Sequence, residues 1–300
     1  MSSWITAGPR GLLAIVVLAA LALGLLAACS PLTVLNGAVP DDAHRVSAGL
    51  AYGPLARQRL DVYRPPGAVN APVVVFFYGG SWRSGERADY RFVGDALAAR
   101  GMVAVVVDYR LYPEAGYPDF LRDAALAVAW TQRHIADHGG DPRRVFVAGH
   151  SAGGYIAAML ALDGRWLGGA GSSPAALAGW IGLAGPYDFL PIVSRTLRPV
   201  FGYPDTPPDS QPIHHVSAAA PPGLLLTGAA DTTVDPRRNS ASLAAALQTA
   251  GACARLVTYP DLGHKLLVGT LSRPLRWRAP VLDDLDAFVA HPCPNAVRQK

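Results

Sequence analysis

The chain has 300 residues, of which 51% are hydrophobic, and its formal net charge at pH 7 is +4. This length suffices for one well-buried core, and the 31 glycines and 26 prolines are spread between apolar runs, which indicates turns and excludes a disordered low-complexity chain. Because the basic residues are scattered and not gathered on one stripe, no nucleic-acid partner is expected.

The first 28 residues have the layout of a secretory signal peptide, with one basic residue, Arg10, followed by an unbroken apolar run over residues 11–26. The sequence Leu26-Ala27-Ala28-Cys29 also resembles the lipobox of bacterial lipoproteins, in which the cysteine becomes the lipidated first residue. We therefore expect export and a lipid anchor at Cys29 on the bacterial cell envelope, in the periplasm or at the outer membrane. An ordinary signal peptide cut near Ala28 and an uncleaved membrane anchor remain alternatives.

Residues 29–300 are expected to form a single domain in which strands and helices alternate. A half-buried edge strand is predicted at residues 58–63, and continuous apolar runs predict buried strands at 72–78, 102–108, 144–150, 179–184, 223–227 and 255–259. Helices are predicted at 89–100, 118–138, 151–162 and 281–290, with a further one opened by Asp235-Pro236. This alternation predicts an α/β fold, namely a mostly parallel eight-stranded sheet with helices on both faces.

Two features lie outside the regular pattern. The irregular, proline- and aromatic-rich stretch at about 187–215 is expected to be a short cap-like insertion over the site. Cys253 and Cys293 are expected to form a disulfide, because disulfides persist in an exported chain; two buried free thiols are the alternative.

A nucleophile elbow is the strongest chemical signal in the sequence. Gly149-His150-Ser151-Ala152-Gly153 matches G-x-S-x-G, and it lies between a predicted strand and a predicted helix. In this motif a sharp turn exposes the serine hydroxyl at a helix N-terminus, where the helix dipole favours developing negative charge. Ser151 is therefore the candidate nucleophile.

A serine hydroxyl needs a base and an acid that orients the base, and in this kind of fold they follow in the order Ser, acid, His. His264 lies just beyond the last predicted strand and is the candidate base, whereas His291 ends the last helix. Asp231, just past the strand at 223–227, is the candidate acid. Asp188 and Asp235 are the alternatives, although Asp235 fits a helix cap better.

The oxyanion hole is expected to take one backbone N–H from Ala152, the residue after the nucleophile, and others from the loop after the third strand. That loop reads Tyr78-Gly79-Gly80-Ser81-Trp82. We expect Gly80 and Ser81 to donate, with Gly79 making room for the substrate carbonyl. Trp82, Tyr109 and Tyr187 are candidates for a substrate pocket.

With these motifs the chain resembles the α/β-hydrolase superfamily, and within it the carboxylesterase and kynurenine formamidase-like branch with an HGGxW oxyanion loop. The resemblance extends over residues 58–290. It is carried by Tyr78-Gly79-Gly80-Ser81-Trp82, Asp108-Tyr109-Arg110-Leu111, Gly149 to Gly153, Gly185-Pro186-Tyr187-Asp188, Asp231 and His264. Tyr78 departs from the family, which usually has His there, so the hydrogen bonds that support the loop must differ.

The resemblance implies a serine hydrolase that cleaves small esters through an acyl-enzyme on Ser151 and needs no cofactor. Amide or formamide hydrolysis and peptidase activity are alternatives, because fold and triad do not fix the leaving group. An exported protein is an unexpected place for kynurenine chemistry, which favours an ester substrate. An inactive hydrolase-fold binding protein of the cell envelope is the non-enzymatic alternative. The sequence contains no CxxC, HExxH or phosphate-loop pattern, so neither a metal nor a nucleotide is expected.

Overall fold

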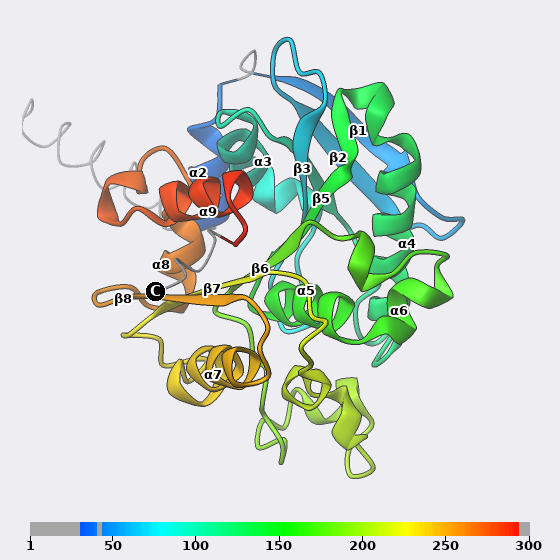
Figure 1. The fold of residues 1–300 in the computed structure, drawn as a ribbon, viewed down its shortest axis with the longest axis vertical. Coiled ribbons are helices and arrows are strands. Elements are labelled where there is room, and N and C mark those ends of the chain that lie inside the picture. The colour runs from blue at the N-terminus through cyan, green and yellow to red at the C-terminus, as the bar shows by residue number, and fades with distance from the viewer. Residues whose placement is uncertain (1–30, 41–43, 294–300) are drawn as a thin grey trace, which may run out of the picture.

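A single eight-stranded sheet organises the computed structural model, which describes residues 31–40 and 44–293 (Figure 1). The predicted signal peptide and Cys29 therefore lie outside the described residues. The strands are β1 (Arg45–Ala51), β2 (Arg59–Arg64), β3 (Ala71–Phe77), β4 (Val103–Val107), β5 (Gly140–His150), β6 (Gly179–Leu183), β7 (Gly223–Gly228) and β8 (Ala254–Tyr259).

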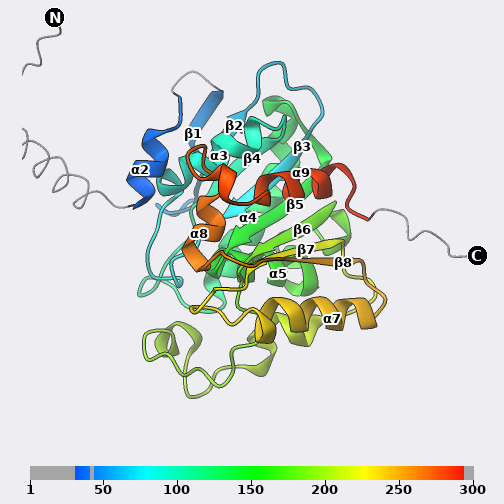
Figure 2. The same ribbon diagram turned by 90° about the vertical axis from the view of Figure 1, so that its left-hand side faces the viewer.

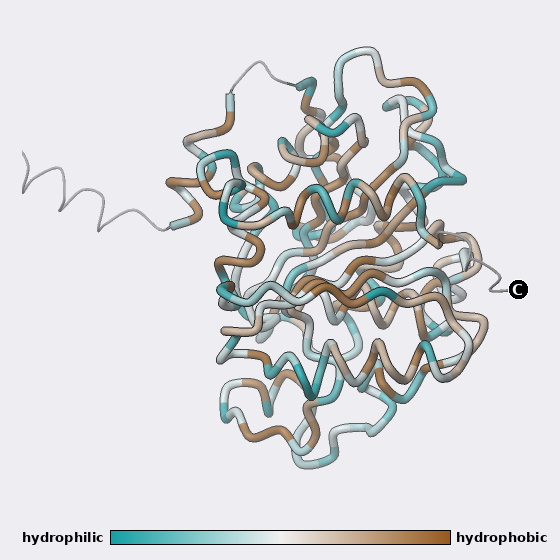
Figure 3. The backbone as a smooth tube through the Cα atoms, turned by 60° about the vertical axis from the view of Figure 1, so that its left-hand side comes forward, coloured by the Kyte–Doolittle hydropathy of each residue, from teal (hydrophilic) through white to brown (hydrophobic). Residues whose placement is uncertain are grey.

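The strand order in the sheet is β1-β2-β4-β3-β5-β6-β7-β8, and β2 runs antiparallel to both of its neighbours while all other pairs are parallel. The mostly parallel α/β fold predicted from the sequence is thereby confirmed. The central strands are apolar along their whole length, because a sheet covered on both faces has no solvent side (Figure 3).

Helices cover the two faces of the sheet (Figures 1 and 2). On one face α3 and α9 lie together, and Arg100, just after α3, pairs with Asp286 of α9 at 3.2 Å. On the other face α4 and α5 pack against the central strands. The helices are α2 (Pro31–Gly37), α3 (Arg91–Ala98), α4 (Asp119–His134), α5 (Ala152–Leu162), α6 (Gly164–Gly169), α7 (Ser242–Thr249), α8 (His264–Gly269) and α9 (Val281–Ala290). In the described residues no helix is both long enough and apolar enough to span a bilayer.

Short helical turns complete the chain. They are the 3-10 turns η1 (Arg87–Tyr90), η2 (Ile135–His138), η3 (Pro174–Ala176), η4 (Arg198–Phe201), η5 (Pro208–Ser210), η6 (Pro212–His215) and η8 (Arg276–Arg278), and the π-helical turn η7 (Arg237–Ala241). Three of them, η4 to η6, lie in the stretch at 187–215 that was expected to be irregular.

The prediction of an edge strand at residues 58–63 is wrong. β2 lies between β1 and β4, and its residues from Leu60 to Tyr63 are buried. The polar residue in this stretch, Asp61, mimics the alternation of an edge strand, but its carboxylate accepts the N–H of Gly49 at 2.7 Å and pairs with Arg87 at 2.8 Å. The edge strand on this side of the sheet is β1, which the sequence analysis did not predict and whose residues are mostly exposed.

A disulfide joins Cys253, just before β8, to Cys293, just after α9, and closes a loop with a sequence separation of 40 residues. Replacing both cysteines with serine should lower the free energy of unfolding by about 3–4 kcal/mol, because the unfolded chain then regains the entropy that this loop had lost. Guanidinium unfolding of the oxidised protein and the double variant measures the difference. Reduced wild-type protein serves as the control and should match the variant; equal midpoints for all three would contradict the prediction.

Candidate active site

Ser151 lies at a sharp turn between β5 and α5, with backbone angles φ 54° and ψ −118°. A positive φ is strained for a residue with a side chain and persists only where the surroundings enforce it. Here β5, α5 and the end of β3 approach so closely that a Cβ at Gly149 would collide with the carbonyl of Gly153, and a Cβ at Gly153 with that of Phe77. The Ser151 N–H donates to the Leu183 carbonyl at 2.8 Å, which fixes the turn to β6.

The structure brings together the serine, histidine and aspartate singled out in the sequence. Ser151 Oγ lies 2.8 Å from His264 Nε2, and His264 Nδ1 lies 2.7 Å from Asp231 Oδ2. Because a carboxylate only accepts, Nδ1 carries the hydrogen and Nε2 is free to accept the serine proton. The side chain of Asp231 is 0% exposed and that of His264 10%, so water competes little for either contact.

Asp231 follows β7, and its loop is shaped by its own carboxylate. Oδ1 accepts the N–H groups of Thr233 at 2.8 Å and Val234 at 2.9 Å, which leaves Oδ2 for His264. Burial pushes the pKa of Asp231 upward, but the hydrogen bonds from His264 and from these N–H groups outweigh it and hold the pKa below its usual range. The carboxylate is therefore ionised and can stabilise a charged imidazole.

The other candidate acids have different partners. Asp235 Oδ1 accepts the N–H groups of Arg237 and Arg238 at 2.8 and 3.3 Å, as a helix cap does. Asp188 forms a long ion pair with the Arg238 side chain at 3.4 Å. Neither carboxylate is bonded to His264, and His291 lies at the far end of α9.

The loop after β3 lies directly against Ser151. A Cβ at Gly79 would lie 3.0 Å from Ser151 Cβ and 2.9 Å from His150 Nδ1, so only glycine lets the loop come this close. Gly80, Ser81 and Trp82 follow with φ values of 136°, 55° and 56°. This run of positive φ turns the chain sharply beside Ser151. The first N–H groups of α5, beginning with Ala152, have no acceptor within the helix, and Ala152 and Ser81 line the same cavity beside Ser151.

Tyr78, which stands where the resembled family usually has histidine, is fully buried and anchors this loop. Its hydroxyl accepts from Arg57 Nη2 at 2.7 Å, and the same nitrogen donates to the Gly85 carbonyl at 2.7 Å. The Tyr109 hydroxyl donates to the Tyr78 carbonyl at 2.8 Å, and the two rings stack with centroids 4.7 Å apart. An arginine and two stacked phenols thus support this loop.

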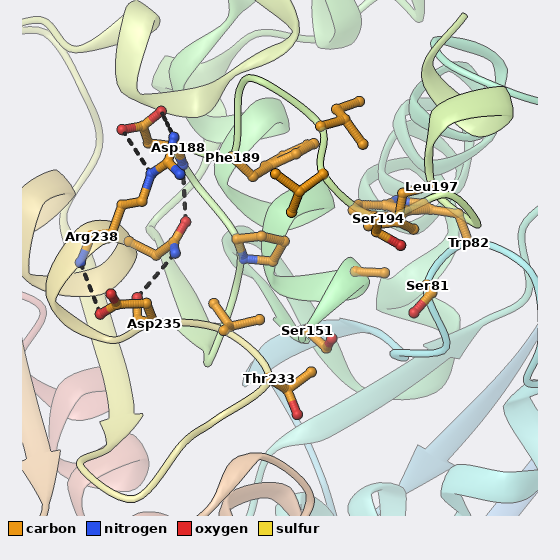
Figure 4. A pocket seen from close by; sticks show the side chains of 16 residues that line it. Ser81, Trp82, Ser151, Asp188, Phe189, Ser194, Leu197, Thr233, Asp235 and Arg238 are labelled. Carbon is orange, nitrogen blue, oxygen red and sulfur yellow. Dashed lines mark hydrogen bonds and ion pairs between the residues drawn. The ribbon is translucent and has the colours of Figure 1, made fainter. Parts of the chain in front are cut away.

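A cavity of about 340 Å³ opens beside Ser151, with Ser81, Trp82 and Ala152 in its wall (Figure 4). One side is apolar and the other carries the Asp188–Arg238 ion pair. The apolar residues of the wall include Trp82, Phe189, Ile192, Val193, Leu197 and Val234. Asn239 holds this wall, since its Oδ1 accepts the N–H groups of Tyr187 at 2.7 Å and Asp188 at 3.0 Å.

Two of the three aromatic residues proposed for the pocket do not line this cavity. Tyr109 is 0% exposed because its ring is stacked on Tyr78. Tyr187 is also 0% exposed, because its ring packs edge-on against Trp180. Trp82 does line the cavity.

Sequence reasoning did not identify three residues that hold the site: Arg57, His150 and Asn239. Of these, His150 is the most central. Its Nε2 donates to the His264 carbonyl at 3.0 Å, and the two imidazole rings are 4.8 Å apart. No sequence signal marked His150 beyond its place in the variable position of G-x-S-x-G. The sequence could suggest only that Tyr78 needs a hydrogen-bond partner, and it did not indicate that Arg57 is that partner.

The buried imidazole of His150 should make stability fall in mild acid. Burial, reinforced by the nearby His264 imidazole, lowers the pKa of His150 to about 3. Because the unfolded state has a pKa of about 6.5, it binds the proton first, and stability that is present above pH 6.5 is lost as the pH falls toward 3. Because of this residue, we expect the free energy of unfolding to be about 2 kcal/mol lower at pH 5 than at pH 7.

Urea unfolding of wild-type protein and His150→Gln at both pH values measures that loss. The stability gap between the two proteins should narrow by this amount at pH 5, because the variant has no imidazole to protonate at this position. A gap that does not change with pH would show that His150 is not kept neutral by the fold.

Comparison with known proteins places this site in a family. Residues 60–247 match the BD-FAE family. The isoprenylcysteine alpha-carbonyl methylesterase of Arabidopsis thaliana is 30% identical over 269 residues, which is 82% of this chain and 62% of that protein. The esterase LipC of Mycobacterium tuberculosis is 32% identical over 206 residues, or 61% of this chain and 50% of that protein. The chain thus spans about half to three-fifths of the length of these relatives.

Among solved structures, a thermophilic esterase of Thermogutta terrifontis in its native form aligns with a TM-score of 0.67 and 26% identity, covering 87% of this chain and 97% of that one. The same esterase has also been solved with bound propionate, with bound butyrate and phosphonylated by sarin. The α/β-hydrolase architecture is shared with these structures, and the match over residues 60–247 shows that the chain belongs to the BD-FAE family.

Proposed function

We propose that this protein is a serine esterase that hydrolyses small carboxylic esters through an acyl-enzyme on Ser151. The observation that carries the proposal is the continuous hydrogen-bonded array from Ser151 Oγ through the His264 imidazole to the buried Asp231 carboxylate, at 2.8 and 2.7 Å. The esterase names of the relatives support the ester as substrate.

In the first half of the reaction, His264 Nε2 takes the proton from Ser151 Oγ as that oxygen attacks the ester carbonyl carbon. The carbonyl oxygen becomes an oxyanion, which we expect the N–H groups of Gly80, Ser81 and Ala152 to stabilise. The protonated His264 then gives its proton to the departing alkoxide. The carbon–oxygen ester bond breaks, the alcohol leaves, and the acyl group remains on Ser151.

In the second half, water replaces the alcohol. His264 removes a proton from the water as its oxygen attacks the acyl carbon, and the same oxyanion contacts stabilise the second tetrahedral intermediate. Collapse of this intermediate breaks the bond to Ser151 Oγ, which regains its proton from His264. The products are the free carboxylic acid and the original enzyme, so atoms and charges balance without any cofactor.

The cavity favours a short acyl group. Its volume is about 340 Å³, and the large rings of Trp82 and Phe189 stand in its wall. Behind them Phe201 packs against both rings, with centroid distances of 4.9 and 5.1 Å, which closes the apolar side. We infer that these rings limit how far an acyl chain can extend on this side, which favours a short acyl group over a long fatty one. The related Thermogutta esterase with bound propionate and butyrate supports the same size range.

For the location of the protein, we infer export and a lipid anchor at Cys29 on the cell envelope. The apolar run over residues 11–26 and the sequence Leu26-Ala27-Ala28-Cys29 support this proposal. Mass spectrometry of the mature N-terminus tests it: a diacylated or triacylated Cys29 is expected, and an unmodified residue 29 or an intact Met1 would contradict it.

The substrate class can be tested with a p-nitrophenyl ester series from acetate to dodecanoate. We expect kcat/KM to be highest at two to four carbons, because the walls of the cavity stop longer chains. Ser151→Ala should reduce the rate to background and should lose labelling by a fluorophosphonate probe. Faster hydrolysis of N-formylkynurenine than of any ester would favour the formamidase alternative, and absence of probe labelling in folded wild-type protein would favour an inactive binding protein.

Replacing Asp231 with Asn tests the role of the carboxylate. The amide can accept the Thr233 and Val234 N–H bonds but can donate to His264, which favours the wrong imidazole tautomer. We expect kcat to fall by about 10⁴ with KM nearly unchanged, as for the equivalent change in a protease triad. Asp235→Asn, at the neighbouring helix cap, is the matched control and should keep its rate within several-fold. Similar rates for both variants would contradict the assignment.

A further inference from the structure

Trp277 is the exposed tryptophan of the described chain. It is 76% exposed, whereas Trp82 and Trp180 are buried in the core. The side chain is nonetheless fixed in place: its Nε1 donates to the Pro274 carbonyl at 3.1 Å, and the Arg278 guanidinium lies over its ring at 5.3 Å. An amphipathic ring fixed in solvent beside a cation is typical of residues that bind at a membrane–water interface.

Leu275, two residues before Trp277, packs against the end of α8 at the same point as Leu35 of α2, the first described helix. Gly269, at the end of α8, connects the two, because its Cβ position lies 3.4 Å from the Leu275 side chain and 4.0 Å from that of Leu35. On α2, Leu35 faces the core while Val34 is 47% exposed. Figure 2 shows α2 and α8 along the same side of the molecule. We call the surface formed by α2 and residues 273–278 the α2–Trp277 face.

The turn at residues 273–278 carries three arginines and no acidic residue. Residues 265–282 include Lys265, Arg273, Arg276 and Arg278 and contain no Asp or Glu, and α2 has no charged residue at all. Arg273 is neutralised by Asp95 at 3.0 Å. Arg278, by contrast, has no acidic partner within residues 31–40 and 44–293. Its charge is thus available to an anionic surface, which attracts basic groups lying close to it.

The segment between Cys29 and α2 is short, so a membrane anchor at Cys29 would keep this face close to the bilayer. α2 begins at Pro31, only two residues after Cys29 and five after Leu26, the last residue of the apolar run. An extended chain covers at most about 3.6 Å per residue, so Pro31 lies within about 7 Å of Cys29. With the proposed lipid on Cys29 in the membrane, or with the apolar run itself in it, the start of α2 must stay near the headgroups.

We propose that the α2–Trp277 face rests on an anionic lipid bilayer, with the Trp277 ring among the headgroups and Arg278 against lipid phosphates. The indole contributes apolar contact at the boundary, and the guanidinium contributes the preference for negative charge. α8 begins at His264, the proposed base, and ends five residues before Pro274. The residues proposed to contact lipid therefore follow closely after this helix. The proposal rests on the membrane anchor proposed above and does not depend on the esterase activity.

Fluorescence of the full-length chain in vesicles tests the proposal. The protein is reconstituted into phosphatidylcholine vesicles with and without phosphatidylglycerol, and the signal of Trp277 is obtained by subtracting that of the Trp277→Phe variant. Lipids brominated near the headgroup should quench this signal, and its quenching by acrylamide should be at least halved relative to protein in detergent. Hydrolysis of a soluble ester should be the same in both proteins, which shows that the variant is folded.

Charge is tested with Arg278→Gln, which should weaken the protection of Trp277 in phosphatidylglycerol vesicles and change little in pure phosphatidylcholine. Arg143→Gln is the matched control, since its side chain is 88% exposed near the opposite, amino-terminal end of β5. Protein that floats with the vesicles while Trp277 stays open to acrylamide would overturn the proposal. So would a chain that does not float with them, or equal effects of the two arginine variants.

Discussion

The turn at Ser151 is the constraint on which the rest of the site depends. Its strained backbone, with φ at 54°, is held because three backbone segments meet with no room for a side chain at Gly149 or Gly153. This close packing sets the serine hydroxyl above the sheet and aims the first turn of α5 at the same point. The parallel sheet does the remaining positioning, because the loops after β3, β7 and β8 leave its same edge.

Buried polar contacts around Ser151, His264 and Asp231 reinforce the contacts that these three side chains make with one another. Arg57 and Tyr78 fix the loop after β3, His150 ties the nucleophile turn to the backbone of His264, and two N–H groups orient Asp231. Such contacts are strong inside a protein because water does not compete for them. The serine, imidazole and carboxylate can therefore be held ready before substrate binds, which is what electrostatic catalysis requires.

The sequence was sufficient to predict the features that depend on local sequence patterns. Ser151, Asp231 and His264 each follow a strand, and their chain order, their places just after predicted strands and the helix-cap pattern at Asp235 singled them out from the other acids and histidines. It was insufficient where contacts between distant parts of the chain determine the environment of a residue. Asp61 suggested a solvent-facing strand because its partner Arg87 lies 26 residues away, and Tyr109 and Tyr187 resembled pocket residues because burial by other rings has no sequence pattern. The hydrogen bonds by which Arg57 and His150 support the site could not be predicted from the sequence for the same reason.

A crystal structure of the protein after reaction with a short alkyl phosphonate would show whether Ser151 is the nucleophile, because the adduct imitates the tetrahedral intermediate. We expect phosphorus bonded to Ser151 Oγ, with its oxygen accepting hydrogen bonds from the N–H groups of Ala152 and of the Gly80–Ser81 loop. His264 should stay bonded to Asp231, and the alkyl group should lie toward Trp82. An adduct on another residue, or an oxygen that points to solvent with these N–H groups unused, would contradict it.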